Sequence, residues 1–337
     1  MEPASRLDKN HQLSLKELPY IIQWREDRCT RCGRCTAVCP MKSIEASVYT
    51  QRVVSSVGAN PEPKVTRRLM PYLFLCYVLA YVDRVNVGFA KLQMQQDLGM
   101  SDSVYGFGAG IFFIGYFIFE VPANMMLQRI GARRWIGPIM MAWGVVSACT
   151  LFVRGASSFY ALRFLLGIVE SGFFPGVILY LTYWFRIRDR ARMVALFSTA
   201  ATLSGFINSP VSGKLLQMDG VRGLAGWQWL FLLEGIPAVI LGLVVIFVLP
   251  DRPQKAGWLS SAEKTWLQLR LDEDMIQSEG RAHFRLSEAF RSGRIWLLCF
   301  IYFLFTVGVY GYEMWLPSII KDFSGLSYYS VGIINAI

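Results

Sequence analysis

Seven long apolar stretches constrain most strongly what this chain can fold into. Each is close to the ~20 residues that an α-helix needs to cross a ~30 Å hydrocarbon core. Strands are excluded at these lengths, because within lipid only a helix satisfies its own backbone hydrogen bonds. The sequence therefore predicts an all-α membrane protein that crosses the bilayer repeatedly. The expected spans are residues 69–89, 104–127, 135–153, 159–185, 193–216, 229–249 and 295–320.

The composition agrees with a membrane protein. Of the 337 residues, 54% are hydrophobic and 17% are charged, whereas soluble domains carry roughly 25% charged residues. A soluble enzyme is excluded, because seven spans of this length have no place in a soluble domain of this size. The net charge of +10 does not indicate a nucleic-acid partner, because the arginines cluster in short segments between the apolar stretches.

Basic residues between the spans predict the orientation in the membrane. Basic-rich and basic-poor segments alternate, and by the positive-inside rule the basic-rich ones are cytoplasmic. The sequence therefore predicts a multi-pass protein of the cytoplasmic membrane with a cytoplasmic N-terminus. The charged segment 250–294 falls on the same side, and its residues 258–275 are expected to form a helix along the membrane surface. The basic-rich set consists of Lys64, Arg67, Arg68, Arg129, Arg133, Arg134, Arg186, Arg188, Arg190 and Arg192.

An eighth span begins near Tyr328, but the chain ends at Ile337. Ten residues of helix reach only ~15 Å, about half of the hydrocarbon core. The chain is therefore expected to be a fragment that stops within a helix.

Four charged side chains lie inside the apolar spans: Asp83, Arg84, Arg163 and Glu170. A charge at membrane depth costs about 3 kcal/mol or more, so it usually faces a water-filled path or a partner charge. Asp83 and Arg84 are adjacent and can line one edge of a cavity, while Arg163 and Glu170 lie within ~20° of one helical face. An arginine offers a fork suited to a carboxylate, and a poorly solvated carboxyl can exchange a proton near neutral pH. The four residues therefore predict a site that binds a carboxylate and a proton and transports them together.

The alternative is that the same charges are structural ion pairs, either Asp83 with Arg163 or Glu170 with Arg84, which lock helices together. Three further acids lie near span ends or near prolines, and for these a structural role is expected. They are Glu120, Glu234 and Glu313.

Six short motifs follow one another along the apolar part of the chain. They are Tyr81–Ala90, Glu120–Asn124, Arg129–Arg134, Arg163–Gly176, Gly226–Gly235 and Leu249–Pro253. In combination, these motifs resemble the major facilitator superfamily, and specifically its anion:cation symporter family. The resemblance runs from about Lys64 to the end of the chain.

The resemblance implies twelve helices in two six-helix halves, each built from inverted three-helix repeats, with the substrate site near the midplane between the halves. This chain would then contain the N-terminal half at 69–249, a cytoplasmic loop at 250–294 and the start of the second half at 295–337. Because the opposite wall of the cavity is missing, the chain alone is expected not to transport.

The resemblance also implies a function and roles for the buried charges. The implied function is secondary transport by a monomer, without a cofactor, of a small organic anion together with protons. A sugar acid, a hydroxy-dicarboxylate and an aromatic acid are the candidate substrates. Proton coupling would fall to Asp83 and Glu170, and binding of the substrate anion to Arg84 and Arg163. Lesser contributions to substrate binding are implied for Tyr81 and Tyr116.

A cluster of cysteines near the N-terminus indicates different chemistry. Cys29, Cys32, Cys35 and Cys39, followed by Pro40, have the spacing of a ferredoxin-type iron–sulfur site. Residues 1–57 are therefore predicted to be a small ferredoxin-like segment, joined by a linker at 58–68, with a 4Fe-4S cluster as the candidate cofactor. A reducing cytoplasm disfavours disulfides, and zinc sites usually use two separated pairs of cysteines.

Two alternatives remain for this segment. A membrane-anchored iron–sulfur electron carrier would make the cluster the working part of the protein. A misjoined reading frame would place a ferredoxin segment in front of an unrelated transporter. In two-cluster ferredoxins the fourth cysteine of such a run binds the other cluster, and this chain has no second run.

Overall fold

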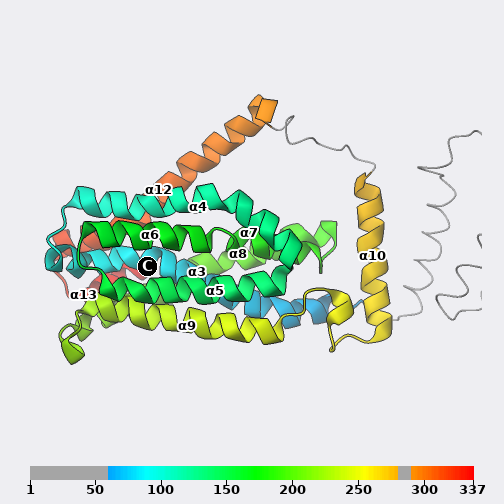
Figure 1. Cartoon of the computed structure of the whole chain (residues 1–337), viewed down its shortest axis with the longest axis horizontal. Helices are drawn as coiled ribbons and strands as arrows, with labels where there is room; N and C mark the ends of the chain where they lie inside the picture. Colours follow the sequence, from blue (N-terminus) through cyan, green and yellow to red (C-terminus); the bar gives the residue numbers. More distant parts are fainter. Residues whose placement is uncertain (1–59, 280–289) are drawn as a thin grey trace, which may run out of the picture. The chain divides into compact units, whose positions relative to one another are not determined.

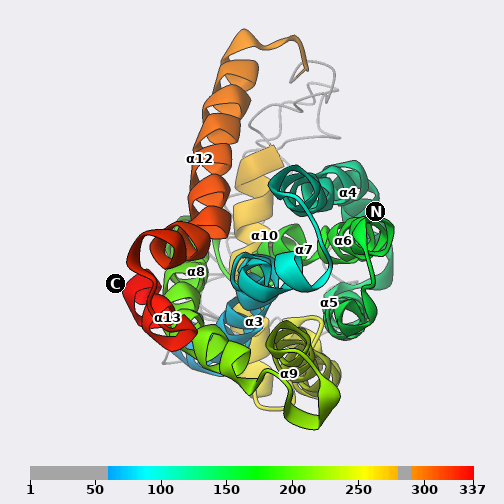
Figure 2. The same cartoon turned by 90° about the vertical axis from the view of Figure 1, so that its left-hand side faces the viewer.

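The computed structural model describes residues 60–279 and 290–337. Within these residues the long regular elements are helices that lie side by side in a bundle (Figures 1 and 2). The helices are α3 (Glu62–Asp97), α4 (Asp102–Ile130), α5 (Ala132–Cys149), α6 (Ala156–Glu170), α7 (Phe173–Thr182), α8 (Ile187–Leu215), α9 (Gly226–Val248), α10 (Ser261–Glu279), α12 (Gly293–Ser324) and α13 (Tyr328–Ala336). Short 3-10 turns are η3 (Thr150–Phe152), η4 (Leu216–Met218), η5 (Val221–Gly223) and η6 (Pro253–Lys255).

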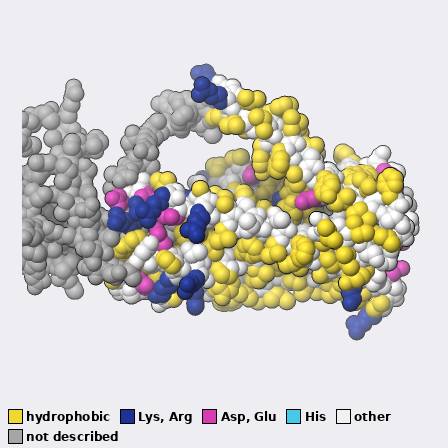
Figure 3. Space-filling model, turned by 180° about the vertical axis from the view of Figure 1, so that it is seen from behind, with side chains coloured by type: hydrophobic (Ala, Val, Ile, Leu, Met, Phe, Trp, Pro, Cys, Tyr) yellow, Lys and Arg dark blue, Asp and Glu magenta, His cyan; other side chains and the backbone are white. Residues whose placement is uncertain are grey.

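The all-α membrane fold predicted from the sequence is confirmed. Seven segments among the described residues are long and apolar enough to cross a membrane, with α6 and α7 together making one of them. Each coincides with one of the seven expected spans. Apolar side chains cover the middle of the molecule, and charged ones gather toward the end where α10 lies (Figure 3). This distribution is the one that a helix bundle in a bilayer requires.

The linker predicted at residues 58–68 is wrong for most of its length, because α3 begins at Glu62. Two prolines suggested a break in the chain, but Pro61 directly precedes the helix, at its N-cap position, and Pro63 lies in its first turn. A proline in the first turn forfeits no helical hydrogen bond, so it is compatible with a helix start. The Glu62 N–H donates to Asn60 Oδ1 at 2.9 Å and so satisfies one of the free donors of that turn.

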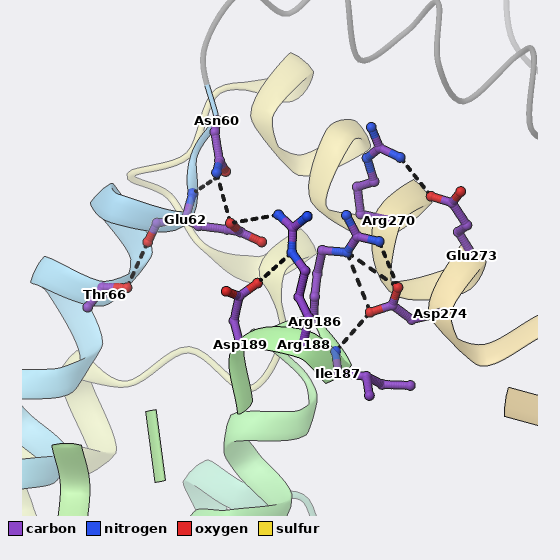
Figure 4. A network of polar contacts seen from close by, with 10 residues as sticks. All are labelled: Asn60, Glu62, Thr66, Arg186, Ile187, Arg188, Asp189, Arg270, Glu273 and Asp274. Carbon is purple, nitrogen blue, oxygen red and sulfur yellow. Dashed lines mark hydrogen bonds and ion pairs between the residues drawn. The ribbon is translucent and has the colours of Figure 1, made fainter. Parts of the chain in front are cut away.

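The helix expected within the loop at 258–275 is present as α10, which lies across one end of the bundle (Figure 1). Two ion pairs attach it. Lys64 Nζ lies 2.9 Å from Glu263 Oε2, and Arg186 Nη2 lies 2.8 Å from Asp274 Oδ1. Asp274 Oδ2 also accepts from the Ile187 N–H at 2.8 Å, so one carboxylate binds both the side chain before α8 and its first backbone amide (Figure 4).

The attachment of α10 by Asp274 is expected to weaken at acid pH. Partial burial alone would raise the pKa of Asp274, but the Arg186 guanidinium and the Ile187 N–H hold that pKa below its ordinary value. The stabilisation of the α10 attachment is therefore present above about pH 4. It is lost as the pH falls through the lower pKa that Asp274 has in the folded protein.

Asp274→Asn is expected to mimic that loss at neutral pH. It should cost about 1 kcal/mol and speed hydrogen exchange of the α10 amides by about fivefold. Glu273→Gln is the matched control, because Glu273 pairs within its own helix, with Arg270 at 2.8 Å. Equal exchange in both variants would contradict an attachment through Asp274.

Glycines set how closely the bundle helices approach one another. A Cβ on Gly144 of α5 would lie 2.7 Å from the Gly235 carbonyl oxygen of α9, and a Cβ on Gly235 would lie 2.7 Å from the Gly144 oxygen. Gly137 and Gly242 make the same reciprocal contact, at 2.9 and 2.8 Å. The two backbones therefore touch at two levels, which only glycine allows.

The helix α12 contacts the bundle through its C-terminal part only. It crosses α3 at Gly88, where a Cβ would lie 3.0 Å from the Met314 carbonyl oxygen. Nearby, Lys91 Nζ lies 3.9 Å from the ring centre of Trp315. Residues 293–305 are exposed, and this part of α12 projects away from the bundle (Figures 1 and 2).

Candidate substrate and proton site

The centre of the candidate site is an ion pair between α3 and the end of α6. Arg84 Nε donates to Glu170 Oε1 at 2.9 Å, and Arg84 Nη2 contacts the same oxygen. The Glu170 side chain is 1% exposed and the Arg84 side chain 11%. One of the two ion pairs considered from the sequence, Glu170 with Arg84, is therefore present.

A break in the fourth span places Glu170 at the end of a helix. The helix α6 ends at Glu170, and α7 begins three residues later at Phe173. Pro175 explains the break, because it cannot donate the backbone hydrogen bond that a continuous helix would make to Ser171. The sequence predicted one uninterrupted span here.

The part of α6 that precedes the break is held against α4 by two glycine contacts. A Cβ on Gly167 would lie 2.1 Å from the Phe112 carbonyl oxygen, and a Cβ on Gly115 would lie 2.6 Å from the Phe164 oxygen. This close approach of α4 and α6 brings the aromatic side chains of α4 next to the charges of α6.

Aromatic rings surround the Arg84 guanidinium. Its Cζ lies 5.1 Å from the ring centre of Tyr116, 5.6 Å from that of Phe112 and 5.9 Å from that of Tyr310. Arg84 Nη1 also donates to Tyr310 Oη at 2.8 Å. Tyr116 was predicted as a site residue, whereas Phe112 and Tyr310 were missed. The spacing of four residues between Phe112 and Tyr116 puts both on one helical face and could have indicated Phe112.

Arg163 is buried without a polar partner. It is 1% exposed, and none of its three side-chain nitrogens has a hydrogen-bond partner among the described residues. Its Cζ lies 4.9 Å from the ring centre of Phe112. The other pairing considered from the sequence, Asp83 with Arg163, is therefore not formed. A buried cation without a partner is costly, and an anion would relieve that cost.

Asp83 faces away from Arg84, toward α5. Trp143 Nε1 donates to Asp83 Oδ2 at 3.1 Å, and Ser147 Oγ donates to Asp83 Oδ1 at 2.7 Å. The expectation that Asp83 and Arg84 line one cavity edge is therefore wrong. Adjacent residues of a helix point about 100° apart. Asp83 therefore meets α5 while Arg84 meets the end of α6, and the two charges have different partners.

Tyr81 contacts an acid of α12. Its hydroxyl is 2.7 and 2.8 Å from the two carboxylate oxygens of Glu313, and its ring stacks on Tyr310 with 6.5 Å between ring centres. Sequence reasoning gave Glu313 a structural role only. The contact brings it to the edge of the candidate site.

The predicted metal ligands Cys29, Cys32, Cys35 and Cys39 lie outside the described residues. Within residues 60–279 and 290–337, no group of three or more histidine, cysteine or acidic side chains could hold a metal ion.

Known proteins resemble this chain in both sequence and structure. A sequence model of the Major Facilitator Superfamily matches residues 73–337, and one of a 4Fe-4S binding domain matches residues 21–44. A bacterial homologue of the human lysosomal transporter Spinster, in an inward-facing and occupied conformation, superposes with a TM-score of 0.63. At 17% identity, with 82% of this chain and 58% of that chain covered, this likeness shows the fold.

Two curated relatives are more similar in sequence. A putative tartrate transporter of Agrobacterium vitis is 52% identical over 274 residues, which is 81% of this chain and 63% of the relative. The putative metabolite transport protein NicT of Pseudomonas putida is 47% identical, with the same two coverages. The chain thus spans 63% of the length of these relatives, which are named transporters and not enzymes. The resemblance inferred from the motifs is confirmed, and the chain belongs to the Major Facilitator Superfamily.

Proposed function

We propose that the protein acts in secondary transport of an organic anion together with protons across the cytoplasmic membrane. The observation that carries this proposal is the buried, unpartnered Arg163 beside the Arg84–Glu170 pair. A substrate carboxylate would supply the counter-charge that Arg163 lacks, and it would compete with Glu170 for Arg84. Tyr116 and Tyr310 line the same position.

The acids supply the coupling in this proposal. When Glu170 takes up a proton, its attraction for Arg84 falls, and Arg84 becomes free to bind the anion. Glu170 Oε2 has no hydrogen-bond partner among the described residues, so it is the atom at which a proton can be added. Asp83, held by Trp143 and Ser147, is the second proposed coupling acid. We propose that the protein is a monomer and that its partners are the organic anion, protons and the lipid bilayer.

The orientation proposed for the chain places α10 and the N-terminus on the cytoplasmic side. Arg133, in the first turn of α5, and Arg186, just before α8, lie at the α10 end of the bundle: the Arg133 backbone N–H donates to Asp251 Oδ1 at 3.1 Å, and Arg186 pairs with Asp274. The positive-inside rule supports this placement.

Uptake of labelled tartrate tests the proposal, because a relative is named a putative tartrate transporter and tartrate is a hydroxy-dicarboxylate. Cells that express the protein from its complete natural gene, with any helices beyond these residues present, should accumulate the label, and a protonophore should stop the accumulation. Asp83→Asn should reduce accumulation by about tenfold or more, since it removes a titrating group without changing shape. Accumulation that survives both the protonophore and this substitution would contradict proton coupling.

Sugar acids and aromatic acids are the next substrates to compare in the same assay. If none of the three classes is accumulated, the organic-anion assignment fails.

A second function is proposed for the N-terminal segment on the strength of the cysteine spacing and the match at residues 21–44. The four thiolates, at 29, 32, 35 and 39, would hold a 4Fe-4S cluster, which supplies one-electron chemistry when bound. Protein purified anaerobically from iron-replete cells should contain iron and acid-labile sulfide and should absorb broadly near ~400 nm. Cys32→Ser should remove all three signals. An iron-free preparation would contradict the cluster and leave the transport proposal untouched.

A further inference from the structure

A third carboxyl, Glu234 of α9, is buried in the bundle between α3 and α8. It is 6% exposed, and Ser212 Oγ donates to its Oε1 at 2.7 Å. The amide of Asn86, which is completely buried, lies beside it. Glu234 Oε2 and both polar atoms of the Asn86 side chain have no hydrogen-bond partner among the described residues. Buried polar atoms without partners are rare, and each requires an explanation.

An ionised Glu234 does not fit these surroundings. A carboxylate at membrane depth needs a cation or several donors, but Glu234 accepts one hydrogen bond, from the neutral Ser212, and the neutral Asn86 amide beside it lies outside hydrogen-bond geometry. A protonated carboxyl carries one O–H donor. A proton on Oε2 could be donated to Asn86 Oδ1, which would satisfy two of the three unpartnered atoms at once.

Asp83 shows the opposite pattern. Both of its oxygens already accept hydrogen bonds, one from Trp143 and one from Ser147, which is what an ionised carboxylate requires. A proton on Asp83 would remove the negative charge that strengthens both of these hydrogen bonds. The proton therefore fits Glu234 better than Asp83 in this conformation.

The two carboxyls are neighbours. Asn86 lies one helical turn after Asp83 on α3. The helices α5 and α9 also meet here. Ala148, which follows the Asp83 partner Ser147, is close to Gly235, which follows Glu234: a Cβ on Gly235 would lie 3.1 Å from the Ala148 nitrogen. The contacts of Asp83 with Ser147 and of Ala148 with Gly235 thus place the two carboxyls close enough for their charges to repel each other. Like charges at this depth oppose joint ionisation, so the pair favours a single negative charge.

The other groups that face the pair do not change this balance. From α6, Glu170 also acts on Asp83, but Arg84 neutralises it, and the Arg163 guanidinium favours the negative charge on Asp83. From α5 and α8 the facing polar groups are uncharged: Trp143, Ser147 and Ser212.

We propose that Glu234, with Asn86 and Ser212, is a proton-binding site that shares one negative charge with Asp83. When the proton passes from Glu234 to Asp83, the O–H bond at Glu234 Oε2 breaks and one forms at a carboxylate oxygen of Asp83. The negative charge moves from Asp83 to Glu234, and no other reactant is needed. Its use in transport rests on the proposed proton coupling, whereas the proton site itself does not.

Infrared spectroscopy of the purified full chain in lipid nanodiscs tests the proposal directly. At neutral pH, the carbonyl-stretch band of a protonated carboxylic acid should be present and should lose intensity in Glu234→Gln. Glu120→Gln is the matched control: Glu120 is a half-buried acid of α4 and should leave the Glu234 band unchanged. An equal band in the parent protein and in Glu234→Gln would overturn the proposal.

Two further variants keep the test decisive if Glu234→Gln folds poorly. Ser212→Ala should shift the frequency of the band, because the hydrogen bond to the Glu234 carbonyl oxygen is lost. Asp83→Asn should make the band vanish at a lower pH than in the parent protein, because the neighbouring negative charge no longer holds the proton. If Ser212→Ala leaves the band frequency unchanged and Asp83→Asn leaves its pH dependence unchanged, the proposed shared site is contradicted.

Sodium ions provide the last comparison. If the site binds a metal cation instead of a proton, adding Na⁺ at constant pH and ionic strength should abolish the band, and the proposal would be overturned. Failure of proton-driven uptake together with an intact Glu234 band would reject the proposed coupling but retain the proton site.

Discussion

Replacement of Arg84 by alanine is expected to abolish uptake of the organic anion. Arg84 contacts an acid, several aromatic rings and the α12 helix at once. Loss of a charged, forked contact to the substrate corresponds to about 3 kcal/mol, or about 100-fold in rate. The substitution also leaves Glu170 buried without its cation, which should favour its neutral form. Uptake of labelled substrate into cells measures the effect.

Two variants separate loss of recognition from loss of folding. Arg154→Ala removes an exposed arginine outside the spans and should leave uptake unchanged. Arg84→Lys keeps the charge but not the fork, so it should recover folding and only part of the uptake. Full uptake in Arg84→Ala, at normal protein levels, would remove Arg84 from the substrate site.

Gly167→Val is expected to be the most destabilising single change in the site region. A Cβ at this position would lie 2.1 Å from the Phe112 carbonyl oxygen and 3.0 Å from the Tyr116 nitrogen, so it meets backbone that cannot rotate away. Forcing α4 and α6 apart should cost about 3 kcal/mol or more and lower the Tm by several degrees. Because Phe112 packs against Arg163, substrate binding should fall as well. Thermal unfolding in detergent, followed by tryptophan fluorescence, measures the change.

Gly110→Val is the matched control for that prediction. Gly110 lies on the same α4 helix and is exposed, and a Cβ added there would meet no atom of a neighbouring helix within 4 Å. It should change the Tm by a degree or two at most, through helix propensity alone. Similar losses in both variants would mean that close packing of α4 on α6 is not the cause.

Much of the architecture could be predicted from the sequence because it depends on local properties. Apolar length alone located the seven spans, and the charged segment 250–294 was correctly expected to contain a helix, which is α10. The predicted linker failed for the same reason: Pro61 and Pro63 indicate a break locally, but they also fit the first turn of a helix.

The partners of the buried charges were harder to predict. The sequence places Asp83 and Arg84 next to each other on one helix, but which helix each one meets depends on how the bundle packs. Trp143 and Ser147 became partners of Asp83 through the packing of α3 beside α5, and no local pattern marks them. Tyr310 entered the site from α12, more than two hundred residues along the chain from Arg84.

The glycine contacts described for α5 and α9 have a mechanical consequence. Two backbones that touch at two levels, Gly137 with Gly242 and Gly144 with Gly235, can neither roll nor slide without a clash at one of them. The helices α5 and α9 should therefore move together as one rigid body. The crossing of α3 and α12 has one such backbone level, at Gly88, and is otherwise held by side chains, such as Arg84 with Tyr310 and Lys91 with Trp315. Side chains can rearrange more readily than touching backbones can separate, so relative motion of helices is expected at the α3–α12 crossing rather than between α5 and α9.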